Sequence, residues 1–291
     1  MPKPDPNLYL PVETYAQAVQ AFHGVCGIIL FEFARRATPR ASKRDVIIRN
    51  FIARTDMMVR AIMRLWDLED YQDCWILHRC LLDRLFHLCH LSQLDQFDVF
   101  EQWSFLEQYN ARNRASSDPE FNQRPESRLF AATPDQKMRA RTLSENPPVW
   151  QRPKAEEVAK QLDMRFLYRL GYDFASTHVH PMASDGDRDF LTITKLEPAP
   201  EFPDQRPVLS NTLLVGLMLV QQGLNASSLR WRALVYGILD DMLKSLGTGE
   251  EEYGPRLAQL ARLFQGGIRL TNETSSTSSD GNDVEPAGDG G

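Results

Sequence analysis

The sequence has few cysteines, and their spacing matches no metal-binding or redox motif. The four, Cys26, Cys74, Cys80 and Cys89, include no CxxC pair and stand in apolar, helix-like stretches. This pattern is typical of buried, reduced thiols in an intracellular protein. The N-terminal residues also lack the apolar core of a secretory signal. We therefore expect a cytoplasmic protein.

Long apolar runs and lysines are scarce as well. The longest apolar runs, residues 27–31 and 212–220, are far shorter than the roughly 20 residues that span a bilayer, so we expect no membrane association. Only seven of the 33 basic residues are lysines, and the formal net charge is −6. This charge argues against a generally basic nucleic-acid binder but is compatible with a local basic patch.

The common catalytic motifs are absent. No GxSxG turn accompanies Ser176 and His178, and there is no GxxxxGKS loop and no HExxH or ExxH pair. A serine hydrolase and an ordinary NTPase are therefore disfavoured. His178 and His180 form an HxH pair to which Asp83, His87 and His90 could add ligands. Residues two apart point to opposite sides of a helix, so we expect neither a bound metal nor another cofactor.

Most of the chain shows the three- and four-residue apolar spacing of helices, which predicts an all-α bundle of about six to eight helices. Ser42 with Asp45, and Thr133 before Pro134, are helix-start signals. The spacing predicts helices over residues 12–36, 42–67, 71–94, 95–114, 134–144, 153–178, 208–246 and 250–264. The helix over residues 153–178 is expected to be continuous or a kinked pair, and that over 208–246 single or broken near residue 223.

The bundle is expected to form one domain over residues 1–265. Residues 115–152 are polar and rich in proline, which predicts an insertion or lid. Residues 182–207 form an Asp/Pro-rich loop in which FLTIT, residues 190–194, is the only strand-like piece. The small, polar and acidic residues 266–291 are expected to form a disordered tail.

The helix over residues 71–94 holds three of the six histidines and three of the four cysteines. At about 100° per residue its apolar side chains cover roughly half the circumference, and His78 lies among them. Arg79, Asp83, His87 and His90 fall within an arc of about 80° on the other side. This polar row is either a solvated face or one wall of a site completed by a second polar element.

Residues 164–181 are the natural second element, because they contain Ser176, His178 and His180. In such a site Arg79 would hold an anion, Asp83 would orient Arg79 or an imidazole, and His178, His180 or His87 would transfer a proton. Arg84 and His90 match the Arg and His spacing of HEPN-class helical ribonucleases, but they stand about 120° apart on the helix. An arginine-rich chain also produces this spacing by chance.

Three segments together resemble a known family. They are ILHRCLLDRLFHLCHL, with Arg79 and Asp83 four residues apart, then FDVFEQWSFLEQY and YDFASTHVHP. They resemble a bacterial helical family, domain of unknown function 5677, over residues 48–189. The resemblance implies a polar centre of Arg79, Asp83, Ser176 and His180. His178 stands one step earlier than the family histidine, and Asp83 stands where glutamate is more usual.

Two functions follow as hypotheses. The first is a cytoplasmic protein whose Arg/Asp/His site acts on or senses RNA, a nucleotide or another phosphate-bearing ligand, with Arg84, Ser176 and His90 as further ligand-binding residues. If it is an enzyme, a hydrolase or metal-independent ribonuclease is expected, in a nuclease-like, stress or defence role. The alternative is a non-enzymatic interaction module, for example a homodimer, in which the polar cluster is purely structural.

Overall fold

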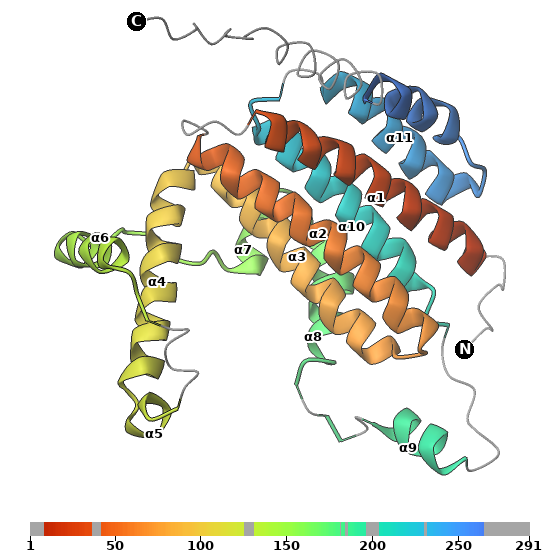
Figure 1. Ribbon diagram of the computed structural model, residues 1–291. Helices are drawn as coiled ribbons and strands as arrows, with labels where there is room; N and C mark the ends of the chain where they lie inside the picture. Colours follow the sequence, from red (N-terminus) through yellow and green to blue (C-terminus); the bar gives the residue numbers. More distant parts are fainter. Residues whose placement is uncertain are drawn as a thin grey trace, which may run out of the picture. The chain divides into compact units, whose positions relative to one another are not determined.

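The computed structural model describes residues 9–36, 42–124, 131–180, 182–183, 186–195, 204–229 and 232–264. They divide into two compact units, Met1–Arg232 and Ala233–Gly291. The predicted all-α class is confirmed, because the described residues form helices and no strand (Figure 1). The predicted disordered tail, residues 266–291, lies outside the described residues.

The helices are more numerous than the six to eight predicted, because several short ones occur where loops or one long helix were expected. A π-helix, η2, spans Leu167–Asp173, and residues 254–264 form a further helix. The α-helices are α1 (Val12–Arg35), α2 (Lys43–Asp67), α3 (Tyr71–Leu94), α4 (Phe97–Ser117), α5 (Pro119–Asn122), α6 (Pro134–Glu145), α7 (Ala155–Gln161), α8 (Phe174–Ser176), α9 (Asp187–Thr194), α10 (Pro207–Ala226) and α11 (Arg232–Thr248).

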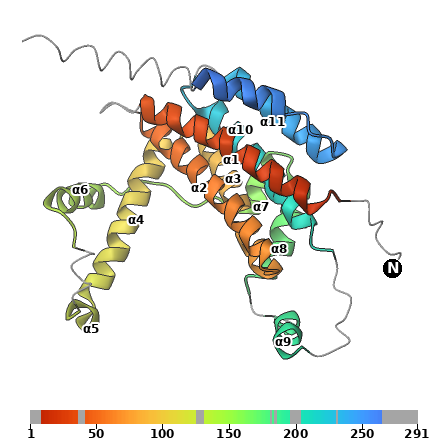
Figure 2. The same cartoon turned by 45° about the vertical axis from the view of Figure 1, so that its right-hand side comes forward.

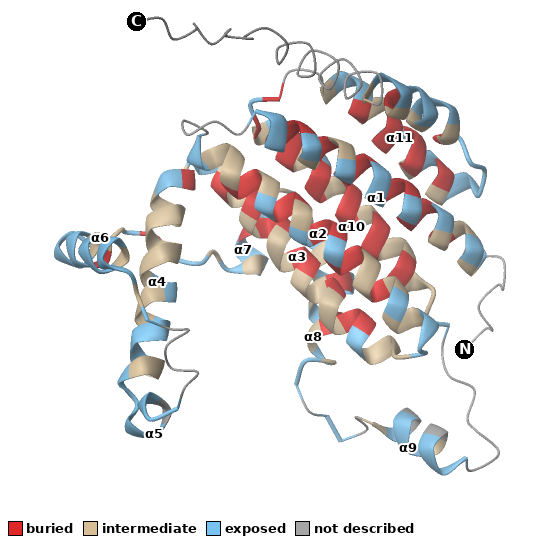
Figure 3. Cartoon of the chain, viewed as in Figure 1, coloured by how far each residue is buried: buried red, intermediate tan, exposed pale blue. Residues whose placement is uncertain are grey.

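The core of the first unit lies among α1, α2, α3 and α10. Helices α2 and α3 are antiparallel neighbours, as predicted, and α10 packs against both of them while α1 packs against α2 and α10. Figure 3 shows the buried residues concentrated in these four helices. Phe22, Ile52, Leu85 and Val215 are among the side chains shielded almost completely from water. Burial of this apolar surface is the main favourable term in forming the bundle.

Helices α1 and α10 are also long and apolar enough, by length and composition alone, to cross a bilayer. Both contribute many side chains to the core. Central helices of a bundle have the same composition. Packing within the unit buries 44% of the apolar window of α1 and 61% of that of α10.

Local capping fixes several helix ends where the sequence predicts them. The Ser42 side chain accepts a hydrogen bond from the backbone N–H of Asp45 at the start of α2. Thr133 and Gln136 form a reciprocal capping box at the start of α6, where Pro134 is the first helical residue. These contacts satisfy N–H groups that the helix itself leaves unpaired. They explain why the predicted starts of these two helices are accurate.

The start predicted for the fourth helix was wrong. Asp95 adopts left-handed backbone angles, with φ of 50°, and ends α3 rather than opening α4. Its side chain instead pairs with Arg44 of α2. Helix α4 begins two residues later at Phe97, which is buried. Aspartate suits both a helix start and a left-handed end, so composition alone did not separate the two.

The strand-like reading of residues 190–194 was also wrong, because they belong to α9. The described residues offer no strand with which FLTIT could pair, so its β-branched residues cannot form a sheet. Asp187 and Asp189 occupy the first turn of α9, where negative charge stabilises the positive end of the helix dipole. Figure 1 and Figure 2 both draw these residues as a short helix.

The element over residues 153–178 is interrupted rather than continuous. Helix α7 ends at Gln161, and Asp163 takes a left-handed φ of 55°. The chain then resumes as η2 and α8, and all three short helices pack against α3. A π-helix differs from an α-helix by its i→i+5 hydrogen bonds, and such segments occur frequently at functional sites. The interruption therefore directs attention to the surface between α3 and η2.

Candidate functional site

The polar row of α3 faces η2 and α8. Gly171 permits this close approach, because a Cβ atom there would lie 2.8 Å from the Cδ1 atom of Leu82 and 3.4 Å from the Nε2 atom of His78. Ala175, one turn later, is fully buried. Small residues thus let η2 and α8 approach α3 closely. The side chains beside this seam are brought within hydrogen-bonding reach.

Arg79 is the centre of the resulting cluster. Its Nε atom donates to the Ser176 hydroxyl at 2.9 Å, and its Nη2 atom donates to the Tyr172 hydroxyl at 2.8 Å. Its Nη1 atom donates to the Asp83 carboxylate at 3.3 Å. We call Arg79, Asp83, Tyr172 and Ser176 the Arg79 cluster. About 23% of the Arg79 side chain remains exposed, so the cluster is accessible from solvent.

The partners of Arg79 are themselves held in place. The Ser176 hydroxyl donates to the backbone carbonyl of Tyr172 at 2.7 Å while it accepts from Arg79. The Arg79 guanidinium also lies 4.6 Å from the centre of the Tyr172 ring. Burial, followed by the negative charge of Asp83, raises the pKa of Tyr172, so its phenol stays protonated at neutral pH. The guanidinium of Arg79 is thus held in one geometry by three side chains.

His87 extends the polar row one turn beyond Asp83. Burial, followed by the positive charge of Arg152, lowers the pKa of His87 to about 4, although Asp83 opposes the shift. Its imidazole is therefore neutral near pH 7 and can accept a proton. The ring meets the buried indole of Trp150 edge to face, with centroids 6.1 Å apart. Arg152 is exposed and influences both His87 and Tyr172 electrostatically.

The two histidines of the HxH pair lie in different surroundings. The His178 ring stacks on Trp75, with centroids 6.3 Å apart, and meets Phe174 edge to face. His180 is exposed, and within the described part of the chain no hydrogen bond or ion pair joins it to the Arg79 cluster. The expectation that an HxH histidine completes the Arg79 and Asp83 pair is therefore not met by His180. Tyr172 occupies the position beside Arg79 instead.

The remaining predicted ligand residues point elsewhere. The Arg84 guanidinium lies over the Phe51 ring of α2, 5.8 Å from its centre. His90 is half-buried, and burial lowers its pKa. Both residues lie on α3 but outside the Arg79 cluster. Arg84 is about 140° from Arg79 around the helix, whereas His90 is on the same side as Arg79 but about three turns further along. Among the residues described, no group of three or more His, Cys, Asp or Glu side chains is close enough to hold a metal ion.

Sequence reasoning did not identify Tyr172 and Arg152. A signal for Tyr172 was present, because it precedes Ser176 by four residues and so shares its helix face. The contacts of Tyr172 and Ser176 with Arg79 depend on η2, however, and the sequence did not predict a π-helix. Arg152 lies in the segment treated as an insertion, between α6 and α7. Its approach to α3 follows from tertiary structure alone.

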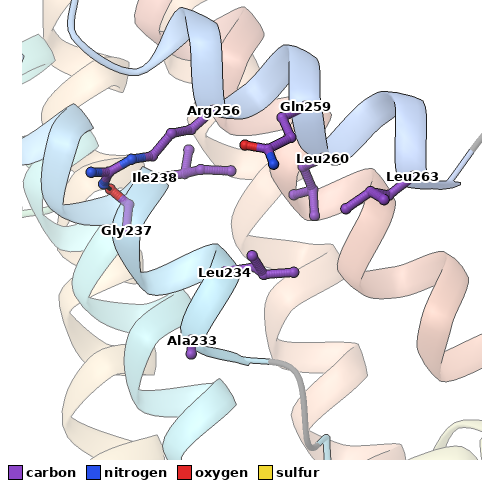
Figure 4. A pocket seen from close by; sticks show the side chains of 8 residues that line it. All are labelled: Ala233, Leu234, Gly237, Ile238, Arg256, Gln259, Leu260 and Leu263. Atoms are coloured by element: carbon purple, nitrogen blue, oxygen red, sulfur yellow. Dashed lines mark hydrogen bonds between the residues drawn. The ribbon is translucent and has the colours of Figure 1, made fainter.

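Two cavities elsewhere in the described structure are less suited to catalysis. In the second unit, a cavity of about 200 Å³ lies between α11 and residues 254–264. Figure 4 shows Leu234, Leu260 and Leu263 around it, with Arg256 bonded to the Gly237 carbonyl at 3.0 Å. In the first unit, a groove of about 280 Å³ is lined by charged residues of α7 and η2. Neither is lined by a histidine, whereas His87 lies one helical turn from Asp83 of the Arg79 cluster.

Comparison with known proteins supports the relationship suggested by the three segments. No curated protein and no solved structure matches the chain. One protein family matches residues 45–193, a range that begins in α2, includes the whole Arg79 cluster and ends in α9. This range covers just over half of the 291 residues. The chain therefore belongs to the family of unknown function DUF5677.

Proposed function

We propose that the Arg79 cluster binds a phosphate-bearing ligand, either RNA or a nucleotide, in a cytoplasmic protein. The main support is the state of Arg79, which is fixed by three side chains and still partly exposed. A guanidinium has five N–H donors, and these bonds use three of them. The other two are available for an oxygen of a phosphate group, and the forked geometry suits that group.

The surrounding charges support the same proposal. Arg152 supplies a second cation beside Tyr172 and His87. The Tyr172 hydroxyl adds a neutral hydrogen-bonding group with a raised pKa. Local positive charge of this kind can attract phosphate even though the whole chain carries a formal charge of −6. The proposal therefore requires local binding and no general affinity for polyanions.

If the ligand is also hydrolysed, His87 is the candidate proton-transfer residue. Its imidazole is unprotonated at neutral pH and is free to take a proton from an attacking hydroxyl or water, although a pKa of about 4 makes it a weaker base than an ordinary histidine. Asp83 stands between Arg79 and His87 on one face of α3 and can orient either of them. This arrangement supports a metal-independent hydrolase, with a ribonuclease as the first candidate.

A second candidate function rests on the same contacts. Arg79 joins α3 to both η2 and α8, so the cluster can serve only to pin these elements together in an interaction module. Replacing Arg79 with methionine and Asp83 with leucine removes both charges without leaving either unpaired. A stable double variant that keeps all ligand binding would favour this structural function. A well-folded variant that loses binding would contradict it.

Arg152 provides the sharper test, because its side chain is exposed and no hydrogen bond within the described part of the chain ties it to the fold. We expect Arg152→Glu to weaken the binding of a fluorescent RNA oligonucleotide or nucleotide by about tenfold at low salt, measured by fluorescence polarisation. Arg141→Glu, on the exposed surface of α6, makes the same change in net charge and should have little effect. Equal weakening by the two substitutions, or no binding by the unaltered protein, would refute the proposal.

A further inference from the structure

An exposed apolar column runs along η2 and its flanks. Phe166, Leu170 and Phe174 follow one another at four-residue intervals, and their exposed fractions are 71%, 56% and 49%. Phe174 covers part of Trp75, with ring centroids 4.9 Å apart, but the outer surface of the column remains open. Contiguous exposed apolar side chains of this size are typical of interaction surfaces. None of these three residues belongs to the Arg79 cluster.

A basic column lies directly beside the apolar one. Arg165 and Arg169 precede Phe166 and Leu170 by one residue each and are exposed. Together with Lys160 they line the groove of about 280 Å³ between α7 and η2, where Glu156 and Asp173 are the acidic members. The surface therefore combines the apolar column with an edge that is mainly positively charged. A complementary partner would present apolar side chains flanked by acidic ones.

Helix α9 presents such a face. Phe190 and Ile193 are three residues apart, and their exposed fractions are 58% and 79%, respectively. On a helical projection, Asp187 and Asp189 flank this apolar pair on its two sides, and both are exposed. One chain thus leaves two complementary surfaces uncovered.

The position of α9 in its own chain is electrostatically unfavourable. Asp189 is one of the charges that raise the pKa of Asp73, after burial and the neighbouring Asp70. Asp189 therefore experiences like charge from Asp73 at the start of α3. The basic column of a second molecule would offer it the opposite charge. Exchange between two molecules would also cover both open surfaces at once, as in an isologous dimer.

We propose that two copies of this chain associate reciprocally, with α9 of each copy docked on the apolar and basic columns of the other. Phe190 and Ile193 would pack against Phe166 and Leu170. The α9 acids would pair with Arg165 and Arg169. Because a two-fold pair contains this contact twice, the buried apolar area is doubled relative to a single docking event.

The test uses charge reversal of the full-length protein and measures mass by sedimentation equilibrium. The unaltered protein should sediment as a dimer. The Arg165→Glu/Arg169→Glu variant and the Asp187→Arg/Asp189→Arg variant should each sediment as monomers, because each juxtaposes like charges. An equimolar mixture of the two variants should restore the dimer, since every α9 then meets a column of opposite charge. Circular dichroism verifies that each variant is folded.

The mixture distinguishes exchange between molecules from other arrangements. If α9 instead closes on its own chain, the unaltered protein is monomeric and the mixture contains no heterodimer. A dimer that persists in both charge-reversed variants would show that another surface holds the copies together. Either result would overturn the proposal, and neither depends on whether the Arg79 cluster binds phosphate.

Discussion

His78 is enclosed where three helices meet, although it is a titratable residue. Its Nδ1 atom lies 3.3 Å from the Thr212 hydroxyl of α10, and its ring meets Trp75 edge to face. Only 1% of the residue is exposed. Burial lowers the pKa of His78 to about 4, so the histidine is neutral in the folded protein at physiological pH. His78 therefore links folding stability to pH.

The direction of this dependence follows from the two pKa values. Between about pH 6.5 and pH 4 the unfolded chain protonates His78 while the folded chain does not, so stability falls as the pH is lowered. His78 alone contributes a slope of up to about 1.4 kcal/mol per pH unit in this window. We predict that His78→Gln, which does not titrate, flattens the pH dependence of the free energy of unfolding.

Urea denaturation of both proteins at several pH values between 4 and 7.5 measures this slope. The comparison concerns slope, so it is independent of any constant stability lost through the weaker contact with Thr212. His180→Gln is the matched control, because His180 is exposed and its replacement should leave the slope unchanged. An identical slope in the unaltered protein and in His78→Gln would contradict the assignment of a buried, neutral imidazole.

Among the elements, α6 is held at the periphery by a small polar contact. The Nη2 atom of Arg139 lies 2.7 Å and 2.6 Å from the two carboxylate oxygens of Glu101 on α4, and its guanidinium lies 4.1 Å from the centre of the Phe105 ring. Lys43 of α2 also pairs with Glu101, at 3.3 Å. Ala140 is the buried residue of α6. A helix with so little buried surface depends on such contacts to stay docked.

We predict that Arg139→Ala releases α6 without unfolding the bundle. Amide hydrogen exchange followed by mass spectrometry should become faster in residues 134–145 and remain unchanged in α2, α3 and α10. Arg141→Ala is the control, because Arg141 is exposed and its ion pair among the described residues is with Glu145 of the same helix. If exchange in α6 is the same in the two variants, the contact with Glu101 and Phe105 does not hold the helix.

At the scale of the whole molecule, two helices that lie outside the matched family region, α1 and α10, form part of the core. The match covers residues 45–193 and so omits α1 and α10. Helix α10 packs against both α2 and α3, and α1 packs against α2. Side chains of the matched region, including Ile48, Ile52 and Leu81, are fully buried in the complete chain. The matched region thus relies on the flanking helices to cover its apolar surface.

We predict that a fragment of residues 45–193 does not fold cooperatively by itself. It should retain helical circular dichroism, bind a hydrophobic dye such as anilinonaphthalene sulfonate and lack a sharp thermal transition, as expected for exposed core surface. The full chain under the same conditions is the control and should show a cooperative transition without dye binding. A sharp transition in the fragment would mean that α1 and α10 are dispensable for the fold.

The amino-acid sequence by itself determined the helical class and the main helices, because periodicity and capping are local properties. The bounds of α3, the Ser42 cap and the capping box of α6 follow from residues that are neighbours in the chain. The i, i+4 pairing of Arg79 and Asp83 is local in the same sense. Such features need no knowledge of what packs against the helix.

Tertiary structure decided which side chains complete the cluster. Tyr172 and Ser176 reach Arg79 because Gly171 admits η2 close to α3 and because the π-helix sets their direction. The pairing of the left-handed Asp95 with Arg44 and the enclosure of His78 likewise depend on contacts made far along the chain. Long-range packing outweighs local preference at these positions, since the local preferences for competing structures are nearly equal there.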